Sequence, residues 1–311
     1  MKNKRIVFMG TADFSEAVLK MLIEEKYNVV AVVSQPDRPV GRKKVLKPTL
    51  VKEVALQHNI PCVQPEKIRT DYQCVLDYEP ELIITAAYGQ IVPNAILEYP
   101  KLGCINVHAS LLPKLRGGAP VHHAIIDGYD KTGVTIMYMA EKMDAGDMIS
   151  KIETPISNED TVGVLYERLT QLGAQLLKDT LPDFLEGKIV AVKQNEEEVT
   201  YAPTIKREEE YISFNKGVKE VDRHIRGLNP WPAGYGIYQG QNIKLLSGHI
   251  TFDTTNKAPG TITKIDKSGI YVACTDGVYC IEEIQVPGKK RMFVRDYLNG
   301  SNQFALNSSF E

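Results

Sequence analysis

The sequence predicts an α/β protein with a parallel-sheet domain first and a small all-β domain second. Strand-like apolar runs alternate with helical patterns up to about residue 189. A polar, charged segment follows at 190–207 and is typical of a linker. Beyond it, short runs near period two are separated by Gly, Pro, Asn and Asp, which indicates a barrel or a sandwich. We therefore expect domains at 1–189 and 208–311, joined by the linker 190–207.

The first half supplies the elements of a covered parallel sheet. Its strands are predicted as continuous apolar runs, and its helices as segments with apolar residues at helical spacing. The expected strands are 5–9, 28–33, 81–87, 103–107 and 133–139. The expected helices are 13–24, 49–58, 120–127 and 161–185, the last one either single or broken. Ligands of such sheets bind beyond the carboxyl ends of the strands.

The second half supplies the elements of the all-β domain. A short helix is expected near 218–228, before the strands. The runs near period two are 242–247, 249–254, 260–265, 269–274 and 277–286.

Composition limits the class of protein. The chain has 311 residues, 43% hydrophobic and 24% charged, with a net charge of -2, which excludes a disordered chain. It contains no apolar run of about 18 residues and no signal-peptide core, so we expect a bacterial cytoplasmic protein with no membrane partner. The five cysteines lack CxxC spacing, so buried free thiols are expected instead of disulfides or a zinc site.

A basic segment stands out at residues 34–52, SQPDRPVGRKKVLKPTLVK. It holds six basic residues and one acidic residue, a local charge of +5. Its three prolines and one glycine argue against a strand or a helix, so a loop is expected. Such a loop is either solvated surface or a site for a polyanion.

Two side chains that can support acyl-group chemistry lie at the carboxyl end of the strand expected at 103–107. Asn106 and His108 are two residues apart, so the period of a strand places both on one face. An amide can donate to an oxyanion, and an imidazole can carry a proton near neutral pH. Taken alone, such a pair favours a purely structural role, with a strand-end histidine and a turn asparagine, over a catalytic one.

An acidic turn, AEKMDAGDM, follows the strand at 133–139. Asp144 could direct its carboxylate at an imidazole, whereas Asp144 and Asp147 could also be solvated or bind a metal. His108 is expected to act as a proton carrier and not as a ligand, so no metal is expected. The first strand is followed by Gly10-Thr11-Ala12-Asp13 and not by GxGxxG, which argues against a nicotinamide-dependent oxidoreductase.

These motifs together resemble a known family. The run INVHASLLPKLRGGAP, followed by TGVTIM and MDAGDM, resembles the signature of the folate-dependent formyltransferases. The similarity extends from about residue 5 to the GKKR at 288–291. It implies a Rossmann-like formyltransferase domain followed by an OB-like barrel. His122-His123 depart slightly from the family pattern, in a helix outside the catalytic motifs.

The resemblance also implies the site residues. Asn106, His108 and Asp144 match the three catalytic positions of the family. The folate-binding positions fall on Ser110, Leu111, Leu112 and Pro113 and on the loop Tyr88, Gly89, Gln90 and Ile91. The implied donor is 10-formyltetrahydrofolate, consumed as a co-substrate without a metal. An amine would attack its formyl group directly, through a tetrahedral intermediate whose oxyanion Asn106 and His108 stabilise.

Three stretches resemble the family members that act on initiator tRNA. They are FMGTADFS, the basic insertion at 34–52, and NPWPAG at 229–234. The implied acceptor is the α-amino group of methionine carried by initiator tRNA, and the chain is expected to act as a monomer in translation initiation. The tRNA-binding residues are predicted as the cations Arg38, Arg42, Lys43, Lys44, Lys47, Lys289, Lys290 and Arg291. Arg42 is expected to contribute most, because it follows Gly41 and its planar guanidinium suits phosphates and bases.

Two other functions stay open at this point. An N-formyltransferase for an amino-sugar nucleotide would keep Asn106, His108 and Asp144 but would not need the basic segment. A non-catalytic RNA-binding module on the same scaffold would need the basic segment but not the three catalytic residues. Steep salt dependence of RNA binding would separate these cases.

Overall fold

The computed structural model describes residues 2–40, 45–300 and 302–311, in two compact units. The first unit contains Met1–Gly118, Thr132–Thr154 and Tyr166–Ala202. The second contains Ala119–Lys131, Pro155–Leu165 and Pro203–Glu311. In the described part of the chain, no helix has the length and apolar character needed to cross a bilayer.

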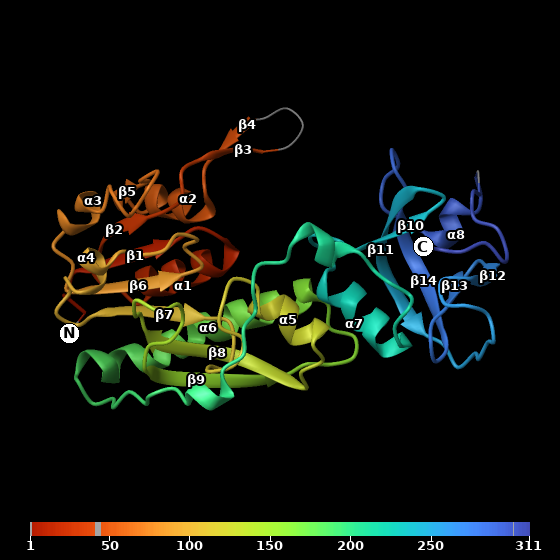
Figure 1. The fold of residues 1–311 in the computed structure, drawn as a ribbon. Helices are drawn as coiled ribbons and strands as arrows, with labels where there is room; N and C mark the ends of the chain where they lie inside the picture. Colours follow the sequence, from red (N-terminus) through yellow and green to blue (C-terminus); the bar gives the residue numbers. More distant parts are fainter. Residues whose placement is uncertain (1, 41–44, 301) are drawn as a thin grey trace. The chain divides into compact units, whose positions relative to one another are not determined.

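A seven-stranded sheet forms the centre of the first unit, in the order β5-β2-β1-β6-β7-β8-β9 (Figure 1). Its strands are β1 (Ile6–Gly10), β2 (Val29–Val33), β5 (Cys62–Val63), β6 (Leu82–Ala86), β7 (Cys104–His108), β8 (Lys131–Tyr138) and β9 (Met148–Pro155). The strands β1, β6 and β7 are buried almost throughout, as their continuous apolar sequences predict.

The prediction of a wholly parallel sheet is wrong at one side. The five strands from β5 to β7 are parallel, but β8 pairs antiparallel with β7, with Ile105 opposite Tyr138 and His108 opposite Thr135. The sheet is therefore mixed. A buried apolar strand reads the same in either direction, so its sequence does not specify its orientation.

Helices cover both faces of this sheet. They are α1 (Asp13–Glu24), α2 (Leu50–Gln57), α3 (Gln73–Leu76), α4 (Asn94–Leu97) and α6 (Val162–Leu185). On one face α6 approaches closely at Gly173, where an added Cβ would lie 2.9 Å from Phe14 of α1 and 3.3 Å from Val107 of β7. On the other face Val75 and Ile96, from α3 and α4, belong to one cluster with Cys104. Successive side chains of β7 therefore point alternately to the layer of α1 and α6 and to the layer of α3 and α4.

The basic segment is not a plain loop, which corrects the expectation from its prolines. Within this segment, β3 (Arg38–Val40) and β4 (Val45–Lys47) pair as a two-stranded antiparallel ribbon that projects from the first unit (Figure 1). Pro39 is tolerated because β3 has a partner on one side only. At the base of the ribbon, Lys52 Nζ donates to Asp37 and to Gln64, at 2.6 and 2.7 Å. This network fixes where the ribbon leaves the unit.

The second unit is built on an antiparallel sheet in the order β10-β11-β14-β13-β12, with β15 paired to β14. Its strands are β10 (Tyr235–Tyr238), β11 (Gln241–Ile250), β12 (Ile262–Asp266), β13 (Gly269–Ala273), β14 (Val278–Gln285) and β15 (Met292–Phe293). Its helices are α5 (Pro120–Ile126), α7 (Val218–Gly227) and α8 (Val294–Tyr297), and the 3-10 turns η1 (Glu196–Glu198) and η2 (Arg207–Glu210) lie in the connecting region. The two runs expected at 242–247 and 249–254 differ from this, because β11 is one strand that ends at Ile250.

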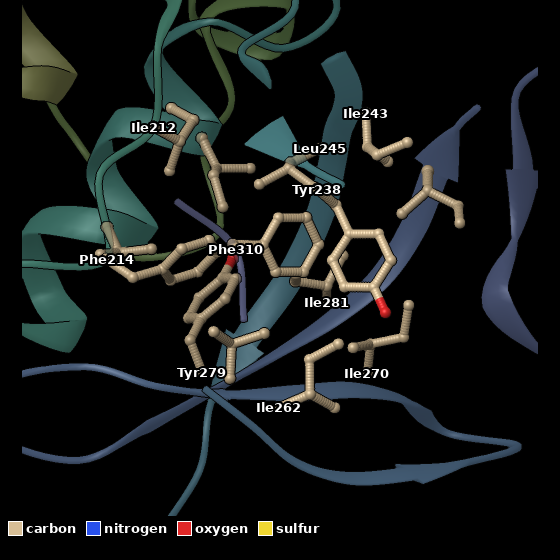
Figure 2. Close-up of a cluster of buried hydrophobic side chains, with 14 of the residues drawn as sticks. Ile212, Phe214, Tyr238, Ile243, Leu245, Ile262, Ile270, Tyr279, Ile281 and Phe310 are labelled. Atoms are coloured by element: carbon tan, nitrogen blue, oxygen red, sulfur yellow. The ribbon is translucent and has the colours of Figure 1, made fainter. Parts of the chain in front are cut away.

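A large apolar cluster forms the core of the second unit (Figure 2), and a smaller one consists of Tyr271, Val278 and Cys280. The ring of Phe310, next to the C-terminus, lies 5.4 Å from that of Phe214 and 5.3 Å from that of Tyr238, centroid to centroid. The backbone around Phe310 bridges to Tyr238 of β10 and, through Ser309, to Thr261 beside β12. The C-terminal segment therefore pairs with both edges of the sheet.

Candidate active site

Strand β7 carries the two predicted polar residues at its carboxyl end. The burial pattern of the strand leaves Asn106 partly accessible and buries His108. The two side chains share one face, as predicted from their spacing. Because β6 and β7 are parallel neighbours with Thr85 opposite Asn106, the segments after both strands start at the same edge of the sheet.

The two ring nitrogens of His108 have different partners. Nε2 lies 3.2 Å from the carbonyl oxygen of Leu115, which can only accept a hydrogen bond. Nε2 must therefore carry a proton for that bond to form, and the Nδ1 lone pair remains for proton transfer in the neutral ring. Nδ1 faces the Asp144 carboxylate, with Oδ2 at 3.8 Å.

Asp144 reaches His108 by a path that follows from the antiparallel direction of β8. Met139 N donates to Cys104 O, so the chain leaves β8 at the amino-terminal end of β7. The turn must run back along β7 to bring Asp144 to His108, and Asp144 Oδ2 then accepts a hydrogen bond from Gly117 N at 2.9 Å. Asp147, the other aspartate of the turn, is exposed.

The Asn106 amide is oriented by Thr85. The Thr85 hydroxyl, which is buried, donates to Asn106 Oδ1 at 2.8 Å. That bond assigns the oxygen of the amide and leaves Nδ2 as the outward donor. Nδ2 makes no hydrogen bond with any residue of the described chain. An acceptor atom of a ligand could take this position.

The turn predicted to bind folate follows β7 directly and is held by hydrogen bonds. Ser110 Oγ donates to Lys114 O at 2.7 Å, so its hydroxyl is engaged in the turn and not poised as a nucleophile. Leu112 N donates to the Thr135 hydroxyl, which in turn donates to Ser110 O. Leu112 and Pro113 are buried, and Leu111 is partly exposed.

The second predicted folate loop follows β6. The carbonyl of Tyr88 accepts hydrogen bonds from the Thr11 hydroxyl and from the Gln35 amide. Gly89 has φ +88°, and an added Cβ would meet only the Gln35 amide nitrogen, at 3.6 Å, so this backbone is open on one side. The Gln90 side chain accepts a hydrogen bond from Ile68 N at Oε1, at 3.0 Å. Ile91 is exposed.

The predicted tRNA-binding cations divide into three groups. Arg38 and Lys47 lie on β3 and β4, and the exposed guanidinium of Arg38 is 3.5 Å from Glu66. Arg42, Lys43 and Lys44 lie outside the described residues. In the second unit, Arg291 forms an ion pair with Glu283, Lys289 Nζ lies 4.7 Å from the Tyr297 ring centroid, and Lys290 is exposed.

The cysteine nearest to Asn106 along β7 is not suited to act as a nucleophile. Cys104 lies on β7, two residues before Asn106, and burial raises the pKa of its thiol to about 12. A thiol that stays protonated is a poor nucleophile. Within the described ranges, no group of three or more His, Cys, Asp or Glu residues is arranged to hold a metal ion.

Sequence reasoning missed the residues that hold this site from a distance. Gln194 donates to the carbonyls of Asp144 and Gly146, and Thr200 accepts from Leu115 N. Both belong to the segment predicted as a linker. Each contacts backbone groups that lie about fifty or more residues away in the sequence, so no local pattern marks them.

Comparison with known proteins identifies the family. A family model described as formyl transferase matches residues 4–181, and one described as formyl transferase, C-terminal domain, matches residues 204–302. The chain belongs to the formyl transferase family. The resemblance noted from the motifs is thereby confirmed, and the chain is an enzyme of formyl transfer.

Curated relatives place this formyltransferase more closely. A methionyl-tRNA formyltransferase from Bacillus mycoides is 55% identical over 301 residues, covering 96% of this chain and 96% of the relative. The enzyme of the same name from Bacillus subtilis is 52% identical over 301 residues, covering 96% and 95%. Within the family, the chain therefore groups with the methionyl-tRNA formyltransferases.

Solved structures share the fold of this formyltransferase at lower identity. WlaRD, described as a sugar 3N-formyl transferase with dTDP and 5-N-formyl-THF, has a TM-score of 0.68 at 19% identity, covering 92% of this chain and 99% of that one. HypX from Aquifex aeolicus, in complex with tetrahydrofolic acid, has a TM-score of 0.65 at 18% identity and 94% coverage of this chain. This chain spans 46% of HypX, and at these identities the likeness concerns the fold alone.

Proposed function

We propose that this formyltransferase transfers the formyl group of 10-formyltetrahydrofolate to the α-amino group of methionine on initiator tRNA. It would act as a monomer in the bacterial cytoplasm, without a membrane partner. The observation that carries the proposal is the approach of Asp144 to His108 Nδ1, at 3.8 Å, beside an Asn106 amide whose Nδ2 points to no described partner. An oxyanion donor, a proton carrier and a carboxylate are the groups that acyl transfer to an amine requires.

In this mechanism each of the three residues has one role. Asn106 Nδ2 donates to the oxyanion that develops when the neutral amine attacks the formyl carbon. His108 Nδ1 accepts the proton that the amine loses as the new C–N bond forms, and it returns this proton to N10 as the old C–N bond breaks. Asp144 faces the positive charge that the ring acquires between these two transfers. No residue of the chain is covalently modified.

The two turns fit a folate co-substrate. Pteridines present several donors and acceptors, which suit the backbone groups of Tyr88, Gly89, Gln90 and Ile91 and of the turn from Ser110 to Pro113. The open side of Gly89 supports close approach of a ligand to this backbone. The co-substrate supplies the formyl carbon and the N10 leaving group.

For the tRNA, we propose contacts from both parts of the chain. Residues 1–189 would hold the catalytic site and the basic ribbon, 208–311 would form an OB-like barrel, and 190–207 would connect them. The pairing of the C-terminal segment with both sheet edges supports a closed barrel. The proposed cations are Arg38, Arg42, Lys43, Lys44 and Lys47 of the basic segment 34–52, and Lys289, Lys290 and Arg291 of the second part.

A transfer assay with three acceptors tests the function. Methionine-charged initiator tRNA, an amino-sugar nucleotide and glycinamide ribonucleotide would each be incubated with 10-formyltetrahydrofolate. We expect formylation of the tRNA alone, reduced about 10²–10³-fold in Asn106→Ala, which loses the oxyanion donor. His108→Ala should also be severely impaired, whereas Arg42→Ala should mainly raise the KM for tRNA.

Controls and alternative outcomes make this assay decisive. Lys20→Ala removes a cation of α1 that is already paired with Glu16, and it should behave as the wild type. Transfer to the amino-sugar nucleotide alone would contradict the tRNA assignment but keep the three catalytic residues. Transfer to no acceptor would favour an RNA-binding module.

A further inference from the structure

We propose that residues 194–202, in the segment expected to be a linker, form a brace that holds His108 and Asp144 in their working geometry. Gln194 and Thr200 are its positioning residues. The inference rests on the proposed function for the roles of His108 and Asp144. All the residues that it uses belong to the first unit.

The need for a brace follows from two unusual backbone conformations. Leu115, whose carbonyl accepts from His108, has φ +60°, and Asp144 has φ +52°. Residues other than glycine rarely adopt this left-handed region. Such conformations persist only where the surrounding structure fixes them, and they concentrate at functional sites. The two residues that orient the His108 ring from either side therefore both depend on outside support.

Gln194 supplies that support to the Asp144 turn. Its Nε2 donates to Asp144 O at 2.8 Å and to Gly146 O at 2.7 Å, so both amide hydrogens hold the turn. Its Oε1 accepts from Nε and Nη2 of Arg116, at 3.0 and 2.8 Å. Gln194 and Arg116 are both buried, although most residues around Gln194 are exposed. This glutamine thus links the Asp144 turn to the turn that follows Leu115.

Thr200 supplies the support on the His108 side. Its hydroxyl accepts from Leu115 N at 2.9 Å, and its carbonyl accepts from Arg116 N, also at 2.9 Å. Ala202 N then donates to Arg116 O at 2.7 Å, which completes a short parallel bridge between the two segments. These bonds fix the direction of the Leu115 carbonyl, and that carbonyl fixes which nitrogen of His108 carries the proton.

Gly117 shows how closely the brace is fitted. It has φ +128°, and an added Cβ would lie 2.5 Å from Ala202 O, so a side chain would push the two segments apart. Its N–H is the group that donates to Asp144 Oδ2. A shift of the brace would therefore move both members of the His108–Asp144 pair at once.

Hydroxyl variants of Thr200 test the brace with little loss of packing. Thr200→Val should lower kcat about tenfold or more, because small misplacements of catalytic groups are costly, while the KM for tRNA stays near that of the wild type. Thr200→Ser keeps the acceptor and should restore kcat. Gln194→Ala should lower kcat further, by about 10²-fold. Thr180→Val, which removes a hydroxyl bonded to Ser150 elsewhere in the unit, is the matched control and should not change kcat.

The imidazole nitrogens give a second readout that a general structural role would not change. In protein labelled with 15N-histidine, the shifts of Nδ1 and Nε2 report which nitrogen is protonated. We expect Thr200→Val to move the His108 signals away from the Nε2–H pattern while the other five histidines stay unchanged. His108→Gln assigns the signal.

The outcomes separate this inference from the proposed function. Wild-type protein that formylates no tRNA would refute the function, yet the His108 signals would still test the brace. Unchanged His108 signals in Thr200→Val would overturn the brace, whatever happens to kcat. If Gln194→Ala fails to fold, the comparison of Thr200→Val with Thr200→Ser decides the question.

Discussion

The orientation of one amide determines what Asn106 can do. An asparagine presents either its oxygen or its NH2 group to a ligand, and only the NH2 group stabilises an oxyanion. The Thr85 hydroxyl donates to Oδ1 at 2.8 Å, which selects the useful orientation. It also lies 3.3 Å from Ile105 O and 3.2 Å from Met139 Sδ, but it has a single hydrogen, and the shortest contact is to the amide.

Removal of this hydroxyl should therefore impair catalysis without removing a catalytic residue. We expect Thr85→Val to lower kcat by up to about tenfold, the effect of one neutral hydrogen bond, and less than Asn106→Ala does. Steady-state kinetics at saturating tRNA would measure it. Thr85→Ser retains the hydroxyl and should keep wild-type kcat, whereas equal loss in both variants would point to packing and not to orientation.

At this scale the sequence predicted some of the candidate site and not the rest. The period of a strand placed Asn106 and His108 on one face, and the family resemblance singled out Asp144. The roles of the Leu115 carbonyl and the Gln194 amide could not be predicted, because a backbone group has no sequence signature and Gln194 lies 50 residues from Asp144 in the sequence. Long-range hydrogen bonds of this kind emerge only when the chain is folded.

At the scale of elements, local periodicity predicted where helices and strands lie, but it did not predict which strands pair or in which direction. The predicted helix 13–24 is α1, and 161–185 is one unbroken helix, α6, from Val162 to Leu185. Strand β9 was missed because it is partly exposed and alternates polar and apolar residues, unlike the buried runs. The direction of β8 and the pairing of β3 with β4 depend on neighbours that no single segment encodes.

The C-terminal segment is an element whose loss should destabilise the second unit. Phe310 is 3% exposed and its ring packs among Phe214, Tyr238 and Phe304. We expect Phe310→Ala to lower the free energy of unfolding by about 3–5 kcal/mol, as for other buried phenylalanines. Chemical denaturation followed by the fluorescence of Trp231, the single tryptophan, reports on this unit.

Phe252 offers a control of the same residue type. It lies beyond the end of β11 and its side chain is fully exposed. Phe252→Ala should leave the unfolding free energy within about 0.5 kcal/mol of the wild type. Similar losses in the two variants would argue that the segment around Phe310 does not complete the core.

For the whole molecule, the distribution of charge matters more than its sum. The net charge of -2 gives no general attraction for a polyanion, so binding of tRNA has to depend on local cations. Several basic side chains are already compensated within the protein: Lys52 by Asp37, and Arg291 by Glu283. Lys47 and Lys290 are exposed, and no ion pair within the described chain involves either one.

The salt dependence of tRNA binding should therefore identify the contributing cations. Each phosphate that a cation neutralises adds about one unit to the slope of log K against log salt, so Lys47→Ala and Lys290→Ala should each reduce the slope by about one. Arg291→Ala should change it less, because Glu283 already neutralises that guanidinium. Lys20→Ala on α1 serves as the control. If Lys47→Ala retained the wild-type slope, Lys47 would not contact phosphate, and its assignment to tRNA binding would be refuted while the catalytic residues would be unaffected.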